Sequence, residues 1–313
     1  MEMKRYISID IGGTAIKYGM IENTGGDSRS DFPYGRTEIL CRYEQNTEAG
    51  KGGGAILKKV MGIVEKLQSD TPVKGIDGIC ISTAGIVDTK KGEIRYSAPL
   101  IPDYTGINFK RELENRFGIP CEVENDVNCA GLAEAVSGAA KGCRAALMLT
   151  IGTGIGGCIL LNGKVFHGAH GSACEAGYLH MRGSDFQTLG AASVLSRKVA
   201  RWKGEPEEIW SGYHIFEEAK KGDRCCNRAI DEMVDVLGEG IADLCYVINP
   251  EIVILGGGIM AQKEFLKGKI DHAVEKYLIP QIKQETKLAF AKHGNSAGML
   301  GAYYHFLSRH LPN

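Results

Sequence analysis

Apolar runs alternate with glycine-rich turns along this chain, and one such pattern occurs twice. Residues 4–21 and 145–161 each contain an apolar run, a turn rich in Gly and Thr, and a second apolar run. Strands bounded by such turn residues are typical of β-hairpins, so we predict a hairpin at each place. Helices and strands are expected to alternate after each hairpin, which indicates a duplicated α/β architecture.

Helices are predicted where apolar residues recur every three to four positions. These segments are 52–68, 107–117, 126–137, 189–202, 213–220, 225–247, 265–277 and 297–307. Further short strands are predicted at residues 37–42, 76–82, 86–88, 120–124, 251–255 and 288–291. We expect Pro72, Gly118 and Asn249 to end helices, because proline, glycine and asparagine are common stop signals. Residues 22–31 and 163–177, which are rich in glycine, are predicted loops.

The duplicated pattern and the length of 313 residues indicate two α/β domains with a cleft between them. We expect residues 1–125, together with about 297–313, to form the N-terminal domain. Residues 126–296 are expected to form the C-terminal domain, which carries the second glycine-rich hairpin and the nucleotide site. The last helix is expected to pack on the N-terminal domain.

Composition excludes several classes of function. The net charge of −1 gives no reason to expect binding to nucleic acid or to an anionic membrane. No apolar run approaches the roughly 20 residues that span a bilayer, and the start lacks a signal-peptide pattern, so we expect a cytoplasmic protein. The ten cysteines are expected to be free thiols, because none has zinc-finger spacing and nothing indicates secretion.

The two hairpin turns are candidate phosphate loops. Glycines leave backbone N–H groups accessible, and a concavity of such groups can hold phosphate oxygens. The candidate residues are Asp10, Gly12, Gly13 and Thr14 in the first turn and Gly152, Thr153, Gly154 and Gly156 in the second. Asp10 could hold Mg²⁺, directly or through water. The alternative is two ordinary hairpins, but the acidic residue at a strand end and the repetition of the turn favour phosphate binding.

A third glycine-rich turn, residues 256–258, follows a predicted strand and precedes helical sequence. It is either a plain strand-to-helix turn or a place where the backbone approaches the base and ribose of a nucleotide.

Two further positions are candidates for acid–base and sugar-binding chemistry. Asn125 and Asp126 end a predicted strand and open a helix, where both are preferred N-cap residues. A carboxylate at such a domain junction is also well placed as a general base. Glu175 lies in a loop of small residues and is either a solvated charge or an acceptor for two sugar hydroxyls. His167 and His170 of the same loop are individually more typical of surface or hydrogen-bonding histidines.

Together these motifs resemble the ROK family of sugar kinases and related repressors, which have the two-domain, ribonuclease H-like fold of actin-like ATPases (ASKHA). The resemblance covers essentially the whole chain and rests on the motifs at residues 10–14, 124–126, 152–157, 167–177 and 255–258. It implies ATP-dependent phosphorylation of the 6-hydroxyl of a hexose, a hexosamine derivative or a β-glucoside, with Mg²⁺. It also implies a homodimer.

The resemblance further implies roles for individual residues. Asp126 would be the base that deprotonates the sugar 6-hydroxyl. The residues that would contact the sugar are Asn125, Glu175, Gly85, Tyr178 and Gln187. The residues that would bind ATP are Asp10, Gly12, Gly13, Thr14, Lys17, Gly152, Thr153, Gly154, Gly156, Gly257 and Gly258. Asp10 would assist Mg²⁺ through water.

The chain departs from the family pattern in its sugar-binding segment. Tyr178 stands where many members have a histidine that contacts the sugar and binds a structural zinc, and residues 182–189 contain no cysteine. Gln187 falls where a glutamate is common. We therefore expect no structural zinc. We also expect a sugar substituted at its anomeric or 2-position, as in β-glucoside kinases and some N-acetylmannosamine kinases.

Two other functions fit parts of the pattern. A ROK-type sugar sensor is one, but ROK repressors carry an N-terminal helix-turn-helix of roughly 80 residues, for which a first strand starting by Arg5 leaves no room. A catalytically weak sugar-binding sensor stays open because of Gln187. The other is an actin-like kinase of acyl or carboxylate groups, which the Glu-Asn-Asp motif at residues 124–126 disfavours.

Overall fold

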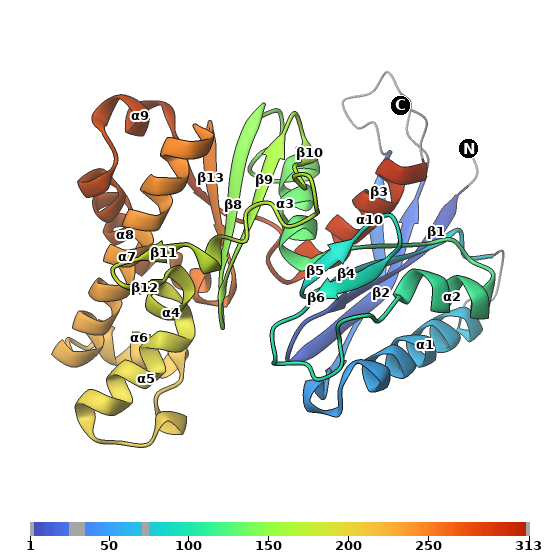
Figure 1. Cartoon of the computed structure of the whole chain (residues 1–313), viewed down its shortest axis with the longest axis horizontal. Coiled ribbons are helices and arrows are strands. Elements are labelled where there is room, and N and C mark those ends of the chain that lie inside the picture. The colour runs from blue at the N-terminus through green and yellow to red at the C-terminus, as the bar shows by residue number, and fades with distance from the viewer. Residues whose placement is uncertain (1–2, 25–34, 71–74, 311–313) are drawn as a thin grey trace. The chain divides into compact units, whose positions relative to one another are not determined.

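The computed structural model describes residues 3–24, 35–70 and 75–310, and the chain forms two compact units (Figure 1). The first unit comprises residues 1–136, 167–172 and 295–313, and the second comprises 137–166 and 173–294. Residues 126–136 therefore group with the first unit, whereas we expected the domain boundary to precede them. The helix stop at Pro72 and most of the predicted loop at 22–31 lie outside the described residues.

The first unit is built on a five-stranded mixed sheet in the order β3-β2-β1-β4-β7. Its strands are β1 (Lys4–Ile11), β2 (Ala15–Asn23), β3 (Thr37–Asn46), β4 (Gly78–Thr83) and β7 (Cys121–Asn125). The first three strands pair antiparallel, and β1, β4 and β7 run parallel. A small hairpin, β5 (Ile86–Asp88) and β6 (Glu93–Tyr96), follows β4.

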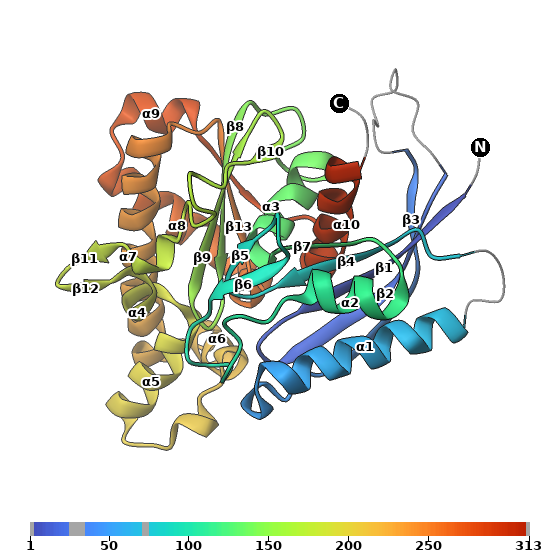
Figure 2. The same cartoon turned by 45° about the vertical axis from the view of Figure 1, so that its right-hand side comes forward.

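Helices cover both faces of this sheet (Figure 2). They are α1 (Gly53–Ser69), α2 (Phe109–Phe117), α3 (Asp126–Ser137) and α10 (Ala297–His310). Side chains alternate between the faces of a strand. Ile7 and Ile9 of β1 are therefore buried in the core that also contains the apolar faces of α1 and α2. Tyr6 and Ser8 point to the other face, where the Ser8 hydroxyl donates to the Met299 carbonyl of α10 over 2.8 Å.

The second unit repeats this topology, with the strand order β10-β9-β8-β13-β14. Its strands are β8 (Ala145–Ile151), β9 (Ile155–Leu161), β10 (Lys164–Val165), β13 (Ile252–Gly256) and β14 (Lys287–Phe290). The first three strands again pair antiparallel, and β8, β13 and β14 run parallel. The duplicated α/β architecture predicted from the two hairpins is confirmed.

The helices of the second unit are α4 (Phe186–Gly190), α5 (Ala192–Lys203), α6 (Gly212–Lys220), α7 (Arg224–Ile248), α8 (Lys263–Tyr277) and α9 (Pro280–Glu285). A two-stranded hairpin, β11 (His180–Met181) and β12 (Ser184–Asp185), precedes α4. The long helix α7 is the centre of the unit's apolar core. Its Gly240 lies where an added Cβ would come within 2.5 Å of the Phe186 ring, so the glycine lets α4 pack closely on α7.

Most predicted elements are found within a few residues of the expected bounds, and one is not. The predicted helix at 189–202 is interrupted at Ala191, which is extended, so that α4 and α5 are separate helices. Elements that were not predicted are β6, β10, the β11–β12 hairpin and α9; β10 lies in the predicted loop at residues 163–177. All ten cysteines are free thiols, as expected. No helix among the described residues is long and apolar enough to cross a bilayer.

Candidate active site

Polar residues of the first unit gather at the carboxyl ends of its three parallel strands. In the register of the sheet, Asp10 of β1 pairs with Ser82 of β4, and Ser82 pairs with Glu124 of β7. The carboxyl ends of parallel strands are the usual place of ligand sites in open α/β sheets. The first unit therefore has a row of polar side chains at the edge where such a site is expected.

Asp10 is held from three directions. The Ser82 hydroxyl donates to Asp10 Oδ1 over 2.7 Å, and Lys17 lies opposite Asp10 in the β1–β2 pair. Gly298 of α10 makes room for the carboxyl group, because a Cβ at Gly298 would lie 2.3 Å from Asp10 Cγ. Burial raises the pKa of Asp10, and the Ser82 hydrogen bond and the Lys17 charge partly offset this. Sequence reasoning missed Ser82 and Gly298 as partners of Asp10.

The first hairpin turn is a small open loop. Gly13 and Thr14 are exposed, and a Cβ added at Gly13 would meet no heavy atom within 4 Å. The Gly12 N–H donates to the Ala15 carbonyl over 3.0 Å, and the buried Thr47 hydroxyl donates to the Gly12 carbonyl over 2.6 Å. Thr47 therefore stabilises the buried side of the turn through the Gly12 carbonyl. The exposed side, at Gly13 and Thr14, has space for a phosphate group.

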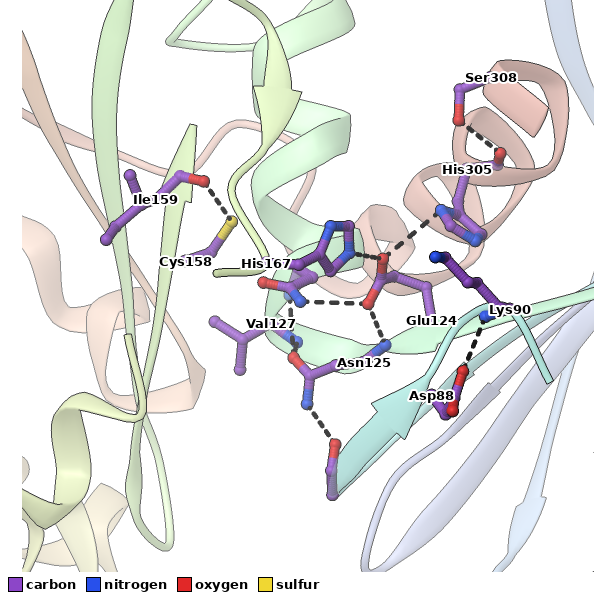
Figure 3. Close-up of polar contacts among 12 residues, drawn as sticks. Asp88, Lys90, Glu124, Asn125, Val127, Cys158, Ile159, His167, His305 and Ser308 are labelled. Carbon is purple, nitrogen blue, oxygen red and sulfur yellow. Dashed lines mark hydrogen bonds and ion pairs between the residues drawn. The ribbon is translucent and has the colours of Figure 1, made fainter. Parts of the chain in front are cut away.

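Asn125 and Asp126 join β7 to α3 through a set of hydrogen bonds, and Figure 3 shows the Asn125 side chain beside Val127. Asn125 Oδ1 accepts from the N–H groups of Val127 at 2.9 Å and Asn128 at 3.0 Å, which is N-cap geometry. Asn125 Nδ2 donates to Asp126 Oδ1 and to the Gly85 carbonyl, both over 3.0 Å. The half-buried Asp126 carboxylate is thus oriented by the cap, and a contact between Asn125 and a sugar stays a prediction.

Gly85 forms the turn between β4 and β5. Its φ is +99°, and a Cβ there would lie 2.6 Å from the Tyr96 carbonyl oxygen, so only glycine fits. Through its carbonyl group it supports the Asn125 amide, and this is the role that the structure shows for it.

The second hairpin turn is tied to the start of α5. The Ala192 N–H donates to the Gly152 carbonyl over 2.9 Å, and the Ser193 hydroxyl donates to the Thr153 carbonyl over 2.8 Å. These contacts use carbonyl groups and leave the outer side of Gly152 open, where a Cβ would meet nothing within 4 Å. Ser193 was not identified from the sequence.

Gly257 and Gly258 lie next to this turn, because Gly256 at the end of β13 pairs with Thr150 of β8. Gly257 has a φ of +96°, and a Cβ there would lie 2.3 Å from the Ile151 carbonyl oxygen. A Cβ at Gly258 would meet nothing within 4 Å. The strand ends of β8 and β13 thus form a second open stretch of backbone, without side chains that would fill it.

The three candidate sugar-binding residues of the second unit lie near one another along the chain but differ in setting. The Glu175 side chain reaches solvent, although partial desolvation of the carboxyl group raises its pKa. Tyr178 is 46% exposed. Gln187 packs inward: its Oε1 lies 2.9 Å from the positions that a Cβ would occupy at Gly154 and at Gly177. Gln187 therefore lies against the second hairpin turn.

The residues present fit a magnesium–nucleotide ligand better than a metal held by protein alone. Within residues 3–24, 35–70 and 75–310, no group of three or more His, Cys, Asp or Glu side chains is arranged to hold a metal ion. Asp10 is a single carboxylate beside an open backbone turn, which is typical of Mg²⁺ bound through water and substrate phosphates. The expected absence of structural zinc stays a prediction.

Comparison with known proteins is consistent with this arrangement along the whole chain. The sequence profile of the ROK family matches residues 6–309. A β-glucoside kinase from Listeria monocytogenes is 32% identical and aligns over 96% of this chain and 96% of its own length. A glucokinase from Halalkalibacterium halodurans is 26% identical, with 96% of this chain and 94% of that protein covered.

Solved structures agree with the sequence comparison. A Listeria monocytogenes protein proposed to be an N-acetylmannosamine kinase has a TM-score of 0.83 and 31% identity, with 97% of this chain and 99% of that one covered. A ROK family glucokinase from Streptomyces griseus, solved with glucose and AMPPNP, has a TM-score of 0.79 and 25% identity over 95% and 97% of the two chains.

The duplicated sheets and these neighbours define the class: an actin-like (ASKHA) α/β fold of the kind that sugar kinases use. The chain belongs to the ROK family, whose profile spans nearly all of it. It is a phosphotransferase of that class, as the sequence motifs predicted.

Proposed function

We propose that this chain transfers the γ-phosphoryl group of ATP to the 6-hydroxyl group of a hexose-type sugar, and that β-glucosides are the first class of acceptor to test. The proposal rests on one observation above all. Asp126 is a half-buried carboxylate oriented by the Asn125 cap, at the carboxyl edge of the parallel strands that also holds Asp10. Phosphoryl transfer depends mainly on such positioning and on charge neutralisation.

In the proposed mechanism Asp126 accepts the proton of the sugar hydroxyl while the hydroxyl oxygen forms a bond to the γ-phosphorus. The bond between that phosphorus and the bridging oxygen of ATP breaks, and ADP leaves with the electron pair. The Asn125 amide and the Val127 N–H both donate to Asp126 Oδ1 and so fix the orientation of the carboxylate toward the substrate. A positioned base of this kind contributes about 10²- to 10⁴-fold to the rate.

The glycine turns hold the nucleotide in this proposal. The open backbone at Gly13, Gly152 and Gly258 has room for phosphate or ribose groups, since a Cβ there would meet no neighbour within 4 Å. Mg²⁺, when bound beside Asp10, neutralises charge on the phosphate oxygens. Lys17, the neighbour of Asp10 across the β1–β2 pair, adds a positive charge on the same side.

The preference for a substituted sugar rests on Tyr178 and Gln187. Tyr178 presents an exposed aromatic ring, and rings of this kind pack against the apolar face of a second sugar or an aglycone. Gln187 is neutral where many family members have a glutamate. The relative named as a β-glucoside kinase, at 32% identity, is consistent with this class.

The decisive variant is Asp126→Asn, which keeps the shape of the side chain but removes the base. We expect kcat to fall at least about 10²-fold, because the proton can no longer be accepted, while ATP binding stays within a few-fold of the wild type. Coupled ADP release measures kcat, and calorimetry measures ATP binding. Asp103→Asn is the matched control, since Asp103 is exposed and asparagine tolerates its left-handed backbone. Near-normal turnover in Asp126→Asn refutes the assignment.

The acceptor is identified by ADP release over a panel of glucose, cellobiose, gentiobiose, N-acetylglucosamine and N-acetylmannosamine. The proposal predicts the highest kcat/KM for one of the two β-glucosides. A sugar that shifts the melting temperature without ADP release, in the presence of ATP and Mg²⁺, would instead identify a sugar sensor.

A further inference from the structure

Glu124 is a fully buried carboxylate that the proposed mechanism does not use. It is 1% exposed and directly precedes Asn125 and Asp126. Its Oε1 accepts from the Asn125 N–H over 2.7 Å and from Asn128 Nδ2 over 3.1 Å. Its Oε2 lies 2.6 Å from His167 Nε2 and 3.5 Å from His305 Nδ1 (Figure 3). A buried charge is retained only when it is paired and hydrogen-bonded, and Glu124 satisfies both conditions.

The partners of the two oxygens divide into two groups. Oε1 binds the peptide of Asn125 and the side chain of Asn128, one turn further along α3. Both contacts fix the first turn of the helix that begins with Asp126. Oε2 binds histidines from two other parts of the chain, α10 and the segment 167–172.

The segment 167–172 belongs to the first unit by its contacts, although the chain on both sides of it belongs to the second unit. Three contacts attach it. His167 binds Glu124, the His170 carbonyl accepts from Arg95 Nη1 over 2.5 Å, and a Cβ at Gly171 would lie 3.2 Å from the Val87 carbonyl oxygen. Of these three contacts, only that of His167 involves Glu124, the carboxylate next to the candidate base Asp126.

We propose that Glu124 is a positioning residue that orients Asp126 through Asn125 and Asn128, and that His167 completes this function by anchoring the segment 167–172 to the same carboxylate. The inference rests on the proposed function, because it assigns these residues to the site of the kinase reaction. It makes the geometry of the base depend on a chain segment that leads, three residues later, to Glu175.

The surroundings of Glu124 favour an ion pair with His167, whereas burial disfavours the charged form of His305. Burial would raise the pKa of Glu124, but the His167 hydrogen bond and the charges of His305 and His167 outweigh it, so that its pKa lies below the usual value. The hydrogen bond to Glu124 raises the pKa of His167, whereas burial lowers the pKa of His305.

The other charged groups that face these histidines are Glu122 and Arg309. Glu122 is itself paired with Lys110 at 2.7 Å and with His310 at 3.0 Å. Above the lowered pKa of Glu124, the Glu124–His167 pair is therefore charged at pH values below the unfolded pKa of histidine, about 6.5. It loses the charge of His167 as the pH rises through the raised pKa of that residue.

Two substitutions at His167 test the proposal, because its side chain is partly exposed and the protein is expected to fold without it. His167→Gln keeps an N–H donor for Glu124, whereas His167→Ala removes it. We expect kcat with the best sugar of the panel to fall about 10- to 100-fold in His167→Ala, because a displaced base costs rate, while KM for ATP stays within about threefold. We expect His167→Gln to recover most of this loss.

The pH profile separates positioning from simple support of the fold. The wild type should show a small alkaline decrease in kcat, no larger than the loss that remains in His167→Gln, because neutral histidine and glutamine both still donate to Glu124. His167→Gln should lack this decrease, since glutamine does not titrate. His170→Ala is the matched control, because the contact with Arg95 uses the backbone carbonyl of His170, which the substitution leaves in place. The pH profile of this variant should equal that of the wild type.

Glu124→Gln tests the carboxylate itself. If it folds, we expect a loss of kcat similar to that of His167→Ala, and the double variant should lose little more than either single variant. If it does not fold, the two His167 variants decide the question alone.

The inference is wrong if His167→Ala has the wild-type kcat and pH profile, or if it lowers only the melting temperature while kcat at a folded temperature is unchanged. Failure of the proposed function is distinct from both, since the wild type itself would then release no ADP with any sugar.

Discussion

Cys174 has a backbone conformation that is unusual for any residue other than glycine. Its φ is +63°, in the left-handed region, and it directly precedes Glu175. Its carbonyl accepts a hydrogen bond from the Ala176 N–H over 2.6 Å, which closes the turn that carries Glu175. A side chain with a Cβ pays about 1–2 kcal/mol for this conformation.

We therefore expect Cys174→Gly to be more stable than Cys174→Ala by about 0.5–1 kcal/mol, because alanine keeps the strain and glycine releases it at some cost in entropy. Both variants lose the thiol, so the comparison isolates the backbone. Urea denaturation followed by fluorescence measures the difference. An alanine variant as stable as the glycine variant would show that the turn is not strained.

The partners of the candidate residues were harder to predict than the residues themselves. Asp10 and Asp126 stand out because each is acidic and adjoins a turn or a cap signal in the sequence. Gly298 does not, and the motif at residues 124–126 assigned no role to Glu124, since both roles depend on contacts between distant parts of the chain. Glu124 and His167 are 43 residues apart, and no local pattern indicates that they meet.

At the scale of elements, the Arg182 side chain connects the β11–β12 hairpin to α7 and α8. Arg182 Nη2 donates to Asp235 Oδ2 of α7 over 2.8 Å and to the Tyr277 hydroxyl of α8 over 2.7 Å, and its Nε donates to Glu239. Arg182 and Gly183 both have positive φ, which matches the tight two-residue turn of a hairpin. The hairpin leads directly into α4, which carries Gln187.

We expect Arg182→Ala to lower the free energy of unfolding by about 1 kcal/mol and to make residues near the hairpin more sensitive to proteolysis. The charged groups are partly exposed, so the loss is modest, but several bonds are lost together. Arg182→Lys should not restore them, because lysine cannot bind two partners in the geometry of a guanidinium group.

Arg144→Ala is the matched control for this experiment. Arg144 pairs with Glu251 at 3.2 Å but is 87% exposed, so its removal should change stability by less than about 0.5 kcal/mol. Equal effects of the two alanine variants would show that Arg182 is an ordinary surface residue.

The elements differ, for physical reasons, in how clearly the sequence indicates them. The helix at 126–137 was predicted with its correct bounds, because its start carries cap residues and its interior is rich in alanine. The hairpin at 180–185 was missed because strands of two residues are too short to show an alternating pattern. The break at Ala191 was missed although Gly190 directly precedes it, because the apolar spacing of residues 189–202 was read as one helix; an extended alanine separates two helices that each pack on α7.

At the scale of the whole molecule, the two sheets share one topology, and each places an antiparallel hairpin beside parallel strands. This duplication was predictable because the Gly/Thr turns repeat in the sequence. The substrate was not, since it depends on side chains such as Tyr178 and Gln187, whose surroundings are set by the packing of the second unit.

The stability of the whole protein should not depend on a bound metal, whereas its activity should. All ten cysteines are free, and the part of the chain that the structure describes holds no cluster of His, Cys, Asp and Glu that could bind zinc. A structural zinc contributes folding energy directly, so its removal would lower the melting temperature.

We expect EDTA to abolish ADP release while shifting the melting temperature by less than about 1 °C, and Mg²⁺ alone to restore activity. Metal analysis of the purified protein should find far less than one zinc per chain. Restoration that requires zinc, or a lower melting temperature in EDTA, would contradict the predicted absence of zinc.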